Sequence, residues 1–358
     1  MHILHVVGAR PNFMKAAPVC QAMADAGLRQ TLVHTGQHYD DRMSAVFFDE
    51  LGLPKPDLDL EVGSGSHAAQ TAEVMKRFEP VVLDRRPDWV IVYGDVNSTM
   101  AAALVCSKLG IRVAHVEAGL RSCDRTMPEE INRLVTDQLA DLLLTHSPEC
   151  ARNLAREGVD AAKVKLVGNT MIDTLVRLLP RAESLWPDIK ASLGINEDAE
   201  YALVTLHRPS NVDDPERLAA IIAALQQIGR MLPVLFPVHP RTSAQLRTHA
   251  IAVPPGVTLM EPLGYLRFSA LQAHARVVIT DSGGVQEETT YLQVPCLTLR
   301  ANTERPVTIS DGTNQLMGED PRDLIPAVSS ILDGWKPSGR TPPLWDGQAG
   351  LRIARLFA

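Results

Sequence analysis

Short apolar runs alternate with longer amphipathic stretches along most of the chain. In the first half, the apolar runs fall at residues 3–7, 30–35, 89–94, 112–117, 142–147 and 163–168, with stretches of helical periodicity between them. Many of these stretches end in glycine, the residue favoured just after a helix. Strands that are apolar almost throughout and are bracketed by helices predict a parallel sheet covered on both faces.

The alternation is interrupted once, near the middle of the chain. Residues 169–199 are predicted to form a helix and a looser polar stretch, and further apolar runs follow at 201–206, 233–238, 257–260, 276–280 and 295–299. The length of 358 residues also suits two domains. The pattern predicts two doubly wound α/β domains, residues 1–169 and 170–345, with a helix at 346–358 that packs back on the first. We expect them to face each other across a cleft, since ligands of such sheets bind at the carboxyl ends of strands.

Composition and charge narrow the classes of partner. The formal net charge is −7 and aromatic residues make up only 4% of the chain, so no nucleic-acid partner is expected. The five cysteines are odd in number and widely spaced, which argues against a disulfide framework and suits a reducing compartment. The apolar run at the N-terminus is too short for a signal peptide, and no run reaches the length of a membrane span. We therefore expect a cytoplasmic protein without a membrane partner.

Residues 280–288, TDSGGVQEE, connect a predicted strand to a predicted helix. The first N–H groups of a helix lack intrahelical partners, and two adjacent glycines let a bulky anion approach them, which favours a phosphate or diphosphate. The two glutamates follow within about a turn and are better suited to accept hydrogen bonds from sugar hydroxyls, so a nucleotide would satisfy both features. The simpler interpretation is an ordinary N-cap with both glutamates on a solvated face. This stretch alone does not decide between the two.

Charged residues follow most of the other predicted strands or open the next helix. Any one of them could be a cap, a turn residue or a packing histidine. Their repetition at strand ends indicates a site with an acid/base side on the first domain and an anion-binding side on the second. The candidates are Arg10, Lys15, Asp95, Glu117, Glu129 and Arg133 in the first domain, and His207, Arg208, His239, Arg241, Glu304 and Arg305 in the second. Glu129 and Arg133 lie four residues apart on one predicted helix, a pairing that could be purely structural.

One stretch matches a dinucleotide-binding fingerprint, Gly63-x-Gly65-x-x-Ala68. The stretch before it, DLDLEV, is polar, alternating and preceded by two prolines, so it would make a poor central strand. A nicotinamide cofactor is therefore not expected. The chain also contains no P-loop, no metalloprotease histidine pair and no nucleophile elbow, and its histidines and aspartates show no metal-ligand spacing. We predict neither a cofactor nor a metal.

Taken together, the motifs resemble those of a known family. The stretches GARPNFMK, TGQHYD, GDVNST, HVEAGLRS, MPEEINR, TLHRPSN, FPVHPR, TDSGGVQEE and TERP occur in the same order as in the non-hydrolysing UDP-N-acetylglucosamine 2-epimerases, from residue 8 to about 315. The resemblance implies the GT-B architecture of two Rossmann-like domains and the interconversion of UDP-GlcNAc and UDP-ManNAc. It also implies that no nicotinamide or metal is needed, that the protein is a homodimer, and that its product supplies surface polysaccharides.

The resemblance further implies roles for individual residues. Asp95, Glu117 and Glu129 correspond to the acid/base carboxylates of the family. The UDP-sugar would be bound by the start of the TDSGGVQEE helix and by donors around it. The implied positions are Ser282, Gly283 and Gly284 for the diphosphate and Glu288 for the ribose hydroxyls. Arg10, His207 and Arg305 would surround the diphosphate, and His207 is also counted among the catalytic residues. Lys15, Arg133 and His239 would lie elsewhere in the substrate site.

The chemistry of C2 inversion fits this set of residues. The proton at C2 of an N-acetylhexosamine is not next to a carbonyl, so inversion needs either transient oxidation by a nicotinamide or expulsion of the group at C1. The predicted diphosphate site favours elimination of UDP to a 2-acetamidoglucal, followed by protonation on the opposite face and re-addition of UDP. We expect Asp95 and Glu117 to handle the C2 proton and Glu129 to assist at the other face.

Two departures from the family keep other substrates and activities open. Tyr39 and Pro209 stand where arginines are common in bacterial members, and Ser210 stands where glutamate is common; the loss of the two arginines weakens the case for activation by a second UDP-GlcNAc molecule. The loop at 121–130 is two residues shorter than the common form and borders the sugar, so a UDP-diacetamido-uronic acid is the nearest alternative substrate. A GT-B glycosyltransferase, a hydrolysing epimerase and an inactive UDP-sugar sensor are further alternatives, although a sensor would not need three acid/base carboxylates.

Overall fold

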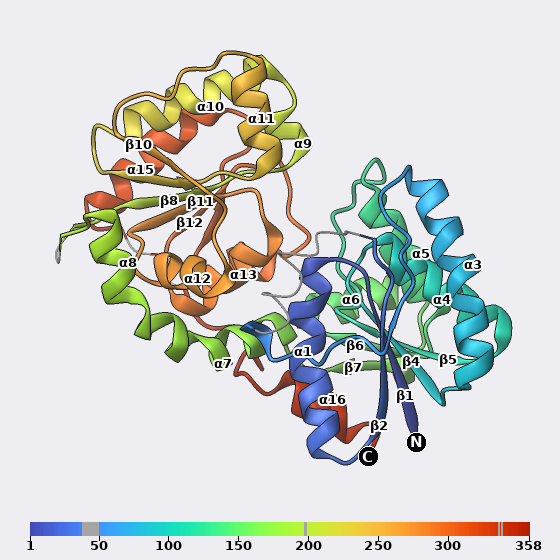
Figure 1. Cartoon of the computed structure of the whole chain (residues 1–358). Coiled ribbons are helices and arrows are strands. Elements are labelled where there is room, and N and C mark those ends of the chain that lie inside the picture. The colour runs from blue at the N-terminus through green and yellow to red at the C-terminus, as the bar shows by residue number, and fades with distance from the viewer. Residues whose placement is uncertain (38–49, 197–198, 336, 338) are drawn as a thin grey trace. The chain divides into compact units, whose positions relative to one another are not determined.

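The computed structural model of the chain describes residues 1–37, 50–196, 199–335, 337 and 339–358 (Figure 1). These residues divide into two compact units, which we call domain 1 (residues 1–177 and 343–358) and domain 2 (residues 178–342). Each domain contains one parallel sheet with helices on both of its faces (Figure 1). The fold class predicted from the alternating pattern, two Rossmann-like α/β domains, is therefore confirmed.

The described part of domain 1 contains a seven-stranded parallel sheet in the order β3-β2-β1-β4-β5-β6-β7. Its central strands are buried on both faces, as their apolar sequences require; Ile3, Leu4, Val6 and Val7 of β1 are almost inaccessible to solvent. The strands are β1 His2–Val7, β2 Arg29–His34, β3 Leu58–Asp59, β4 Trp89–Tyr93, β5 Arg112–Val116, β6 Leu142–Thr145 and β7 Val164–Leu166. The helices are α1 Arg10–Asp25, α3 His67–Arg85, α4 Asn97–Leu109, α5 Pro128–Leu139, α6 Pro148–Arg156, α7 Thr170–Ser184, which continues into domain 2, and α16 Ala349–Arg355.

The described part of domain 2 contains a six-stranded parallel sheet in the order β10-β9-β8-β11-β12-β13. Its core forms where the apolar strands meet the apolar face of α10. The strands are β8 Ala202–Thr205, β9 Val234–Pro237, β10 Val257–Met260, β11 Val277–Thr280, β12 Cys296–Thr298 and β13 Asn314–Leu316. The helices are α8 Trp186–Leu193, α9 Pro209–Val212, α10 Pro215–Ile228, α11 Pro240–Thr248, α12 Tyr265–Ala273, α13 Gly283–Leu292, α14 Val307–Ser310 and α15 Leu324–Leu332.

Each predicted apolar run forms a strand, within a residue or two of its predicted bounds. Two further strands among the described residues, β3 and β13, were not predicted, and both lie at sheet edges. An edge strand pairs on one side only and can be short and polar, so its sequence carries little apolar signal. The position of β3 at the edge agrees with the interpretation that DLDLEV is a poor central strand. None of the helices that the structure describes has both the length and the apolar character needed to cross a bilayer.

The division between the domains falls within α7, later in the chain than the predicted boundary at residue 169. The first half of α7 is tied to domain 1 by Asp173, whose carboxylate accepts hydrogen bonds from the backbone N–H groups of Ala349 (3.0 Å) and Gly350 (2.7 Å). These two N–H groups are among the unpaired donors at the start of α16, so Asp173 caps that helix from a distance of many residues in sequence.

The C-terminal segment, residues 343–358, belongs to domain 1 and lies beside α1 (Figure 1). The contact between the two helices is close, since a Cβ atom on Gly350 would stand 2.6 Å from the carbonyl oxygen of Pro18. Before the helix, the buried Trp345 donates from Nε1 to the carbonyl oxygen of His146 (3.0 Å). The segment thus fills part of the core of domain 1.

Candidate functional site

In domain 1, a buried ion pair joins α1 to the end of β5. Lys15 binds the carboxylate of Glu117, and both side chains are almost fully buried. Glu117 directly follows β5 and has a positive φ of 72°, which is uncommon for a residue with a side chain. Gly94, after β4, leaves room for this pair, because a Cβ atom there would stand 2.8 Å from Nζ of Lys15 and 3.4 Å from Oε2 of Glu117. The turn after β4 therefore requires glycine.

Asp95 is held by a buried arginine on α5. Arg133 donates from Nη2 (2.6 Å) and Nε (3.0 Å) to Oδ2 of Asp95, and from Nη1 to Oε2 of Glu130 (2.6 Å). The side chain of Arg133 is only 2% exposed, whereas that of Asp95 is 24% exposed. The partner of Arg133 on its own helix is thus Glu130, three residues before it, where the sequence had suggested Glu129. Glu130 was not predicted as a site residue, although its spacing from Arg133 also places both on one helix face.

Asp95 and Glu129 line the same pocket, which has a volume of about 300 Å³. Its other walls include the amide side chains of Asn97 and Asn132, and Asn132 donates to the backbone carbonyl of Asp95 (2.8 Å). Gly65, from the stretch that matches the dinucleotide fingerprint, also lines this pocket. Two of the three predicted carboxylates therefore share one polar pocket at the carboxyl edge of the sheet, beside donors that could bind a sugar.

A second layer of buried charges lies behind these residues. His115 bonds through Nε2 to the carbonyl oxygen of Gly94 (2.7 Å) and through Nδ1 to Asp137 (2.6 Å). Asp137 also accepts from the backbone N–H of Gly119 (3.0 Å) and binds Arg121 (2.7 Å). Burial alone would raise the pKa of Asp137, but the charges and hydrogen bonds of His115 and Arg121 hold it below its usual value. This network, which we did not predict, fixes the turns that carry Asp95 and Glu117.

Arg10 is the first residue of α1, which starts at the carboxyl end of β1. The turn before it is fixed by Asn12, whose side chain accepts from the backbone N–H groups of Gly8 (3.1 Å) and Ala9 (3.2 Å) and donates to the carbonyl of Tyr93 (2.8 Å). The six candidates of domain 1 thus lie on turns or helices that follow β1, β4 and β5. The structure does not describe His38 and Tyr39 of the TGQHYD motif.

In domain 2, the TDSGGVQEE stretch forms the end of β11 and the start of α13. Ser282 is the N-cap, and Gly283 and Gly284 are the first two residues of the helix. The guanidinium of Arg305 lies against Gly283 and donates from Nε to Oε1 of Glu287 (2.7 Å). Glu287 and Glu288 are both buried, so the simpler interpretation, which placed them on a solvated face, was wrong.

Glu288 lies inside domain 2 with two hydrogen-bond donors. The hydroxyl of Tyr265 donates to Oε1 (2.9 Å), and the amide of Gln272 donates to Oε2 (3.0 Å) when its own oxygen accepts from the backbone of Thr289. Burial raises the pKa of Glu288 to about 7, the charge of Glu287 adds to this, and the hydrogen bond from Tyr265 opposes it.

Asp281 fixes the loop that carries His207. Its buried carboxylate accepts from the backbone N–H groups of His207 (3.1 Å) and Arg208 (2.9 Å) and from the side chain of Asn211 (3.1 Å). Although burial would raise the pKa of Asp281, the hydrogen bond and charge of His207 and the other donors hold it below its usual value. The ring of His207 is 42% exposed, and its centroid lies 5.7 Å from that of His239, which caps α11.

An arginine cluster follows β8 and β12, the strands on either side of β11. Arg208, Arg300 and Arg305 all contact the carboxylate of Glu304, at 3.4, 2.7 and 3.5 Å respectively. Arg305 also contacts Glu287, so three guanidinium groups and the carboxylates of Glu304 and Glu287 lie close to the start of α13, with the carboxylate of Asp281 beside the backbone of Arg208. Arg300 was not predicted as a site residue, although it stands four residues before Glu304 at the end of β12. Cationic side chains next to a helix N-terminus suit a phosphate or diphosphate.

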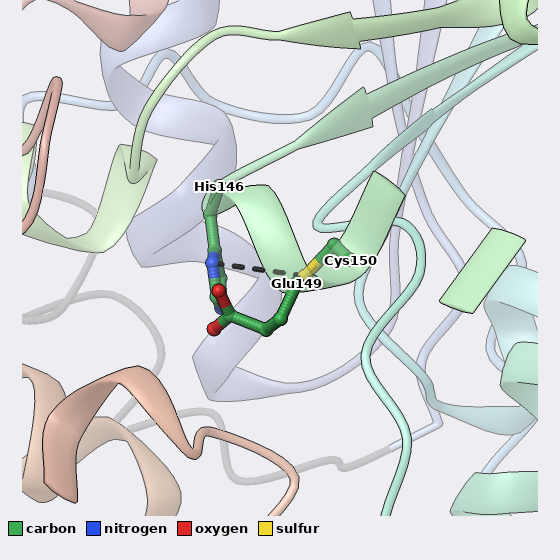
Figure 2. A group of neighbouring side chains, drawn as sticks. All are labelled: His146, Glu149 and Cys150. Carbon is green, nitrogen blue, oxygen red and sulfur yellow. Dashed lines mark hydrogen bonds between the residues drawn. The ribbon is translucent and has the colours of Figure 1, made fainter. Parts of the chain in front are cut away.

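One cluster in domain 1 has the side chains of a metal site. One ligand atom from each of His146, Glu149 and Cys150 lies within 4.8 Å of the others (Figure 2). No metal site was predicted, because this short spacing across the start of a helix matches none of the patterns typical of metal ligands.

The chain is similar to proteins of known family over its whole length. The model of the family described as UDP-N-acetylglucosamine 2-epimerase matches residues 21–358. A UDP-N-acetylglucosamine 2-epimerase of Methanocaldococcus jannaschii is 41% identical over an alignment of 367 positions, gaps included, which covers 100% of this chain and 99% of the relative. A UDP-2,3-diacetamido-2,3-dideoxy-D-glucuronate 2-epimerase of Pseudomonas aeruginosa is 40% identical, with 100% and 99% of the two chains covered.

The fold is also similar to that of a solved relative. The crystal structure of Methanocaldococcus jannaschii UDP-GlcNAc 2-epimerase in complex with UDP-GlcNAc and UDP superimposes with a TM-score of 0.91 at 40% identity, covering 100% of this chain and 99% of that one. The sequence motifs, the two Rossmann-like domains and these similarities agree. The chain belongs to the UDP-N-acetylglucosamine 2-epimerase family of isomerases.

Proposed function

We propose that this chain catalyses the reversible C2 epimerisation of UDP-GlcNAc to UDP-ManNAc by elimination and re-addition of UDP. The observation that carries the proposal is the set of carboxylates at the carboxyl edge of the domain 1 sheet. Asp95 is fixed by Arg133, Glu129 lines the same pocket, and Glu117 is paired with Lys15. Inversion at C2 needs an acid and a base on opposite faces of the sugar, and such a set can supply both.

In the proposed reaction, a carboxylate removes the C2 proton while the C1–oxygen bond to UDP breaks, which gives a 2-acetamidoglucal and UDP. A proton is then added to C2 from the opposite face, and the diphosphate oxygen re-forms the bond at C1. We assign the C2 proton to Asp95 and Glu117 and the assisting role at the other face to Glu129. Lys15 and Arg133 would position these carboxylates, as their contacts support.

UDP can leave only if the charge that grows on its diphosphate is met by donors already in place. We assign this role to the start of α13, with Ser282, Gly283 and Gly284, and to Arg305 beside it. The guanidinium groups of Arg208, Arg300 and Arg305, which gather near this helix start, support the assignment. His207, His239 and Arg10 would add further donors, and Glu288 would accept from the ribose hydroxyls.

The test is proton NMR of the purified protein with UDP-GlcNAc in D₂O. We expect UDP-ManNAc to appear and deuterium to enter C2 of both sugars, since each passage through the glucal exchanges the C2 proton with solvent. Accumulation of free ManNAc and UDP would identify a hydrolysing enzyme instead. No exchange with any UDP-hexosamine, in a protein that still binds UDP, would rule out the proposed reaction and favour a glycosyltransferase.

A UDP-2,3-diacetamido-uronic acid is the second candidate substrate. It is favoured by the relative from Pseudomonas aeruginosa, which matches this chain almost as well as the UDP-GlcNAc 2-epimerase from Methanocaldococcus jannaschii. The same exchange experiment distinguishes the two, because the true substrate should incorporate deuterium at C2 far faster than the other.

The proposal extends to the role and assembly of the protein. The product would supply ManNAc units for surface polysaccharide, and the active form would be a homodimer that needs neither nicotinamide nor metal for catalysis. Light scattering coupled to gel filtration gives the mass in solution, and a monomer of full activity would contradict the proposed dimer. Activity that is lost on adding a chelator would contradict the metal-independent reaction.

A further inference from the structure

Domain 1 brings three potential metal ligands, none of them assigned to the reaction, together at the start of α6. His146 follows β6, the N-cap of α6 is Ser147, and Glu149 and Cys150 lie in the first turn of the helix. Figure 2 shows the three side chains converging, with Nδ1 of His146 3.9 Å from Sγ of Cys150. The turn from strand to helix therefore places an imidazole, a carboxylate and a thiol around one point.

The separation of the imidazole nitrogen and the thiol sulfur suits a tetrahedral metal ion. Zinc binds thiolate sulfur at about 2.3 Å and imidazole nitrogen at about 2.0 to 2.1 Å, which holds the two atoms about 3.6 Å apart. The observed separation of 3.9 Å is close to this value, so small side-chain movements would complete the two bonds. A thiolate and a carboxylate would together balance the two charges of the ion.

The surroundings hold two of these ligands in place. The carbonyl oxygen of His146 accepts from Nε1 of Trp345 (3.0 Å), and the two rings pack edge to face with centroids 5.8 Å apart. Cys150 packs against Gly119, where a Cβ atom would stand 2.9 Å from that of Cys150. Glu149 is only partly buried as a residue, but its Oε1 atom is inaccessible to solvent and has no hydrogen-bond partner, so this oxygen is available to a cation.

We infer that His146, Glu149 and Cys150 form a binding site for a soft divalent cation of the zinc type. Sulfur and imidazole ligands select zinc and similar ions over magnesium and calcium, which prefer oxygen. A ligand nitrogen of His146 also lies within 4.8 Å of a carboxylate oxygen of Glu117. A bound cation would therefore place positive charge next to Glu117, a proposed acid/base residue, and should slow turnover. This effect on turnover rests on the proposed function, whereas binding of the cation does not.

The test uses the metal alone. The full chain, reduced and freed of metal with a chelator, is incubated with Zn²⁺ and passed through a desalting column, and retained zinc is measured by mass spectrometry. Titration with Cd²⁺ follows thiolate binding directly through the ultraviolet charge-transfer absorption. We expect the wild-type protein to retain one equivalent of zinc, and Cys150→Ser to bind about a hundredfold more weakly without the cadmium absorption band.

Two further variants keep the test decisive. Glu149→Gln changes a partly exposed side chain, should fold normally and should weaken zinc binding at least tenfold. Cys123→Ser removes an exposed cysteine elsewhere in the domain and should leave binding unchanged. Equal zinc retention by wild type, Cys150→Ser and Glu149→Gln, or no retention by wild type, would overturn the inference. Because no UDP-sugar is present, either result is independent of whether the epimerase reaction occurs.

Discussion

The guanidinium of Arg305 lies directly against Gly283, the first residue of α13. A Cβ atom on Gly283 would stand 2.8 Å from Cζ of Arg305, closer than two such carbons can approach. The glycine therefore has two roles at this helix start. It leaves the backbone N–H groups open to an anion, and it allows an arginine to reach the same place.

Gly283→Ala should weaken UDP binding about tenfold or more, because the added methyl group would displace Arg305 from the diphosphate position. Isothermal titration with UDP measures the change. In an Arg305→Ala background the same glycine substitution should have little further effect, because the contact that it disturbs is already gone. An equal loss in both backgrounds would show that Gly283 acts without Arg305.

Asp95→Asn should lower the rate of C2 proton exchange about a hundredfold or more while UDP binding stays near the wild-type value. The amide cannot act as a base, but it keeps the size of the carboxylate and can still contact Arg133. Exchange into D₂O, followed by NMR, gives the rate. Asp84→Asn is the matched control, since the side chain of Asp84 is 76% exposed at the end of α3. Near-wild-type exchange in Asp95→Asn would refute its assigned role.

Gly94→Ala should reduce turnover strongly, because the methyl group would collide with Lys15 and disturb its ion pair with Glu117. The positive φ of 62° at this position adds about 1 kcal/mol of backbone strain. Gly110→Ala separates the two effects, since Gly110 has a similar φ of 69° but no neighbour within 4 Å of an added Cβ. The control should show a similar change in the thermal unfolding midpoint with turnover retained. Equal turnover in the two variants would mean that the Lys15 contact is unimportant.

Glu288→Gln should change how stability depends on pH. The pKa of Glu288 is raised to about 7 by burial, so the folded protein favours the neutral carboxyl group. The stability that the neutral carboxyl group of Glu288 contributes is therefore fully present below the pKa that this group has in the unfolded chain. It is lost as pH rises through about 7. Between pH 5 and 8 the wild-type free energy of unfolding should fall by about 2–3 kcal/mol relative to Glu288→Gln. Urea unfolding at both pH values checks this, and parallel changes in the two proteins would contradict it.

Asp281→Ala should destabilise domain 2 by about 3 kcal/mol, because it leaves the buried donors of His207, Arg208 and Asn211 without an acceptor. Since the folded-state pKa of Asp281 is lowered, this contribution is present at neutral pH and is lost as pH falls through that lowered value. Chemical unfolding at pH 7 measures the loss. Asp320→Ala removes an exposed ion pair with Arg322 in the same domain and should have a much smaller effect. Comparable losses would contradict the structural role of Asp281.

The sheets were predictable because a central parallel strand must be apolar on both faces, and each such run in the sequence formed a strand. Two of the four edge strands, β3 and β13, were not predicted, because they are short and carry polar residues such as Asp59 and Asn314. The position of the division within α7 also could not be read from the pattern. The pattern shows where α7 begins, but contacts such as those of Asp173 with α16 and of Thr174 with Met14 are needed to show that its first half packs in domain 1.

The residues of the site were likewise predictable only in part. Residues that follow strands, such as Asp95 and Glu117, could be picked out because parallel strands bring their carboxyl ends to one edge. The residues that hold them could not, because the partners of Arg133 and His115 are chosen by packing between elements far apart in sequence. The burial of Glu287 and Glu288 was likewise missed, since two adjacent glutamates at a helix start are usually solvated.

The return of residues 343–358 to domain 1 has a consequence for synthesis of the protein. Domain 2 is a continuous segment and has all its strands once residue 316 has left the ribosome, whereas the core of domain 1 still lacks Trp345 and α16. The domain made first is thus the one completed last, which reverses the usual N-to-C order of folding during translation. Until then, the surface of α1 that α16 covers stays exposed on the nascent chain, where chaperones can bind it.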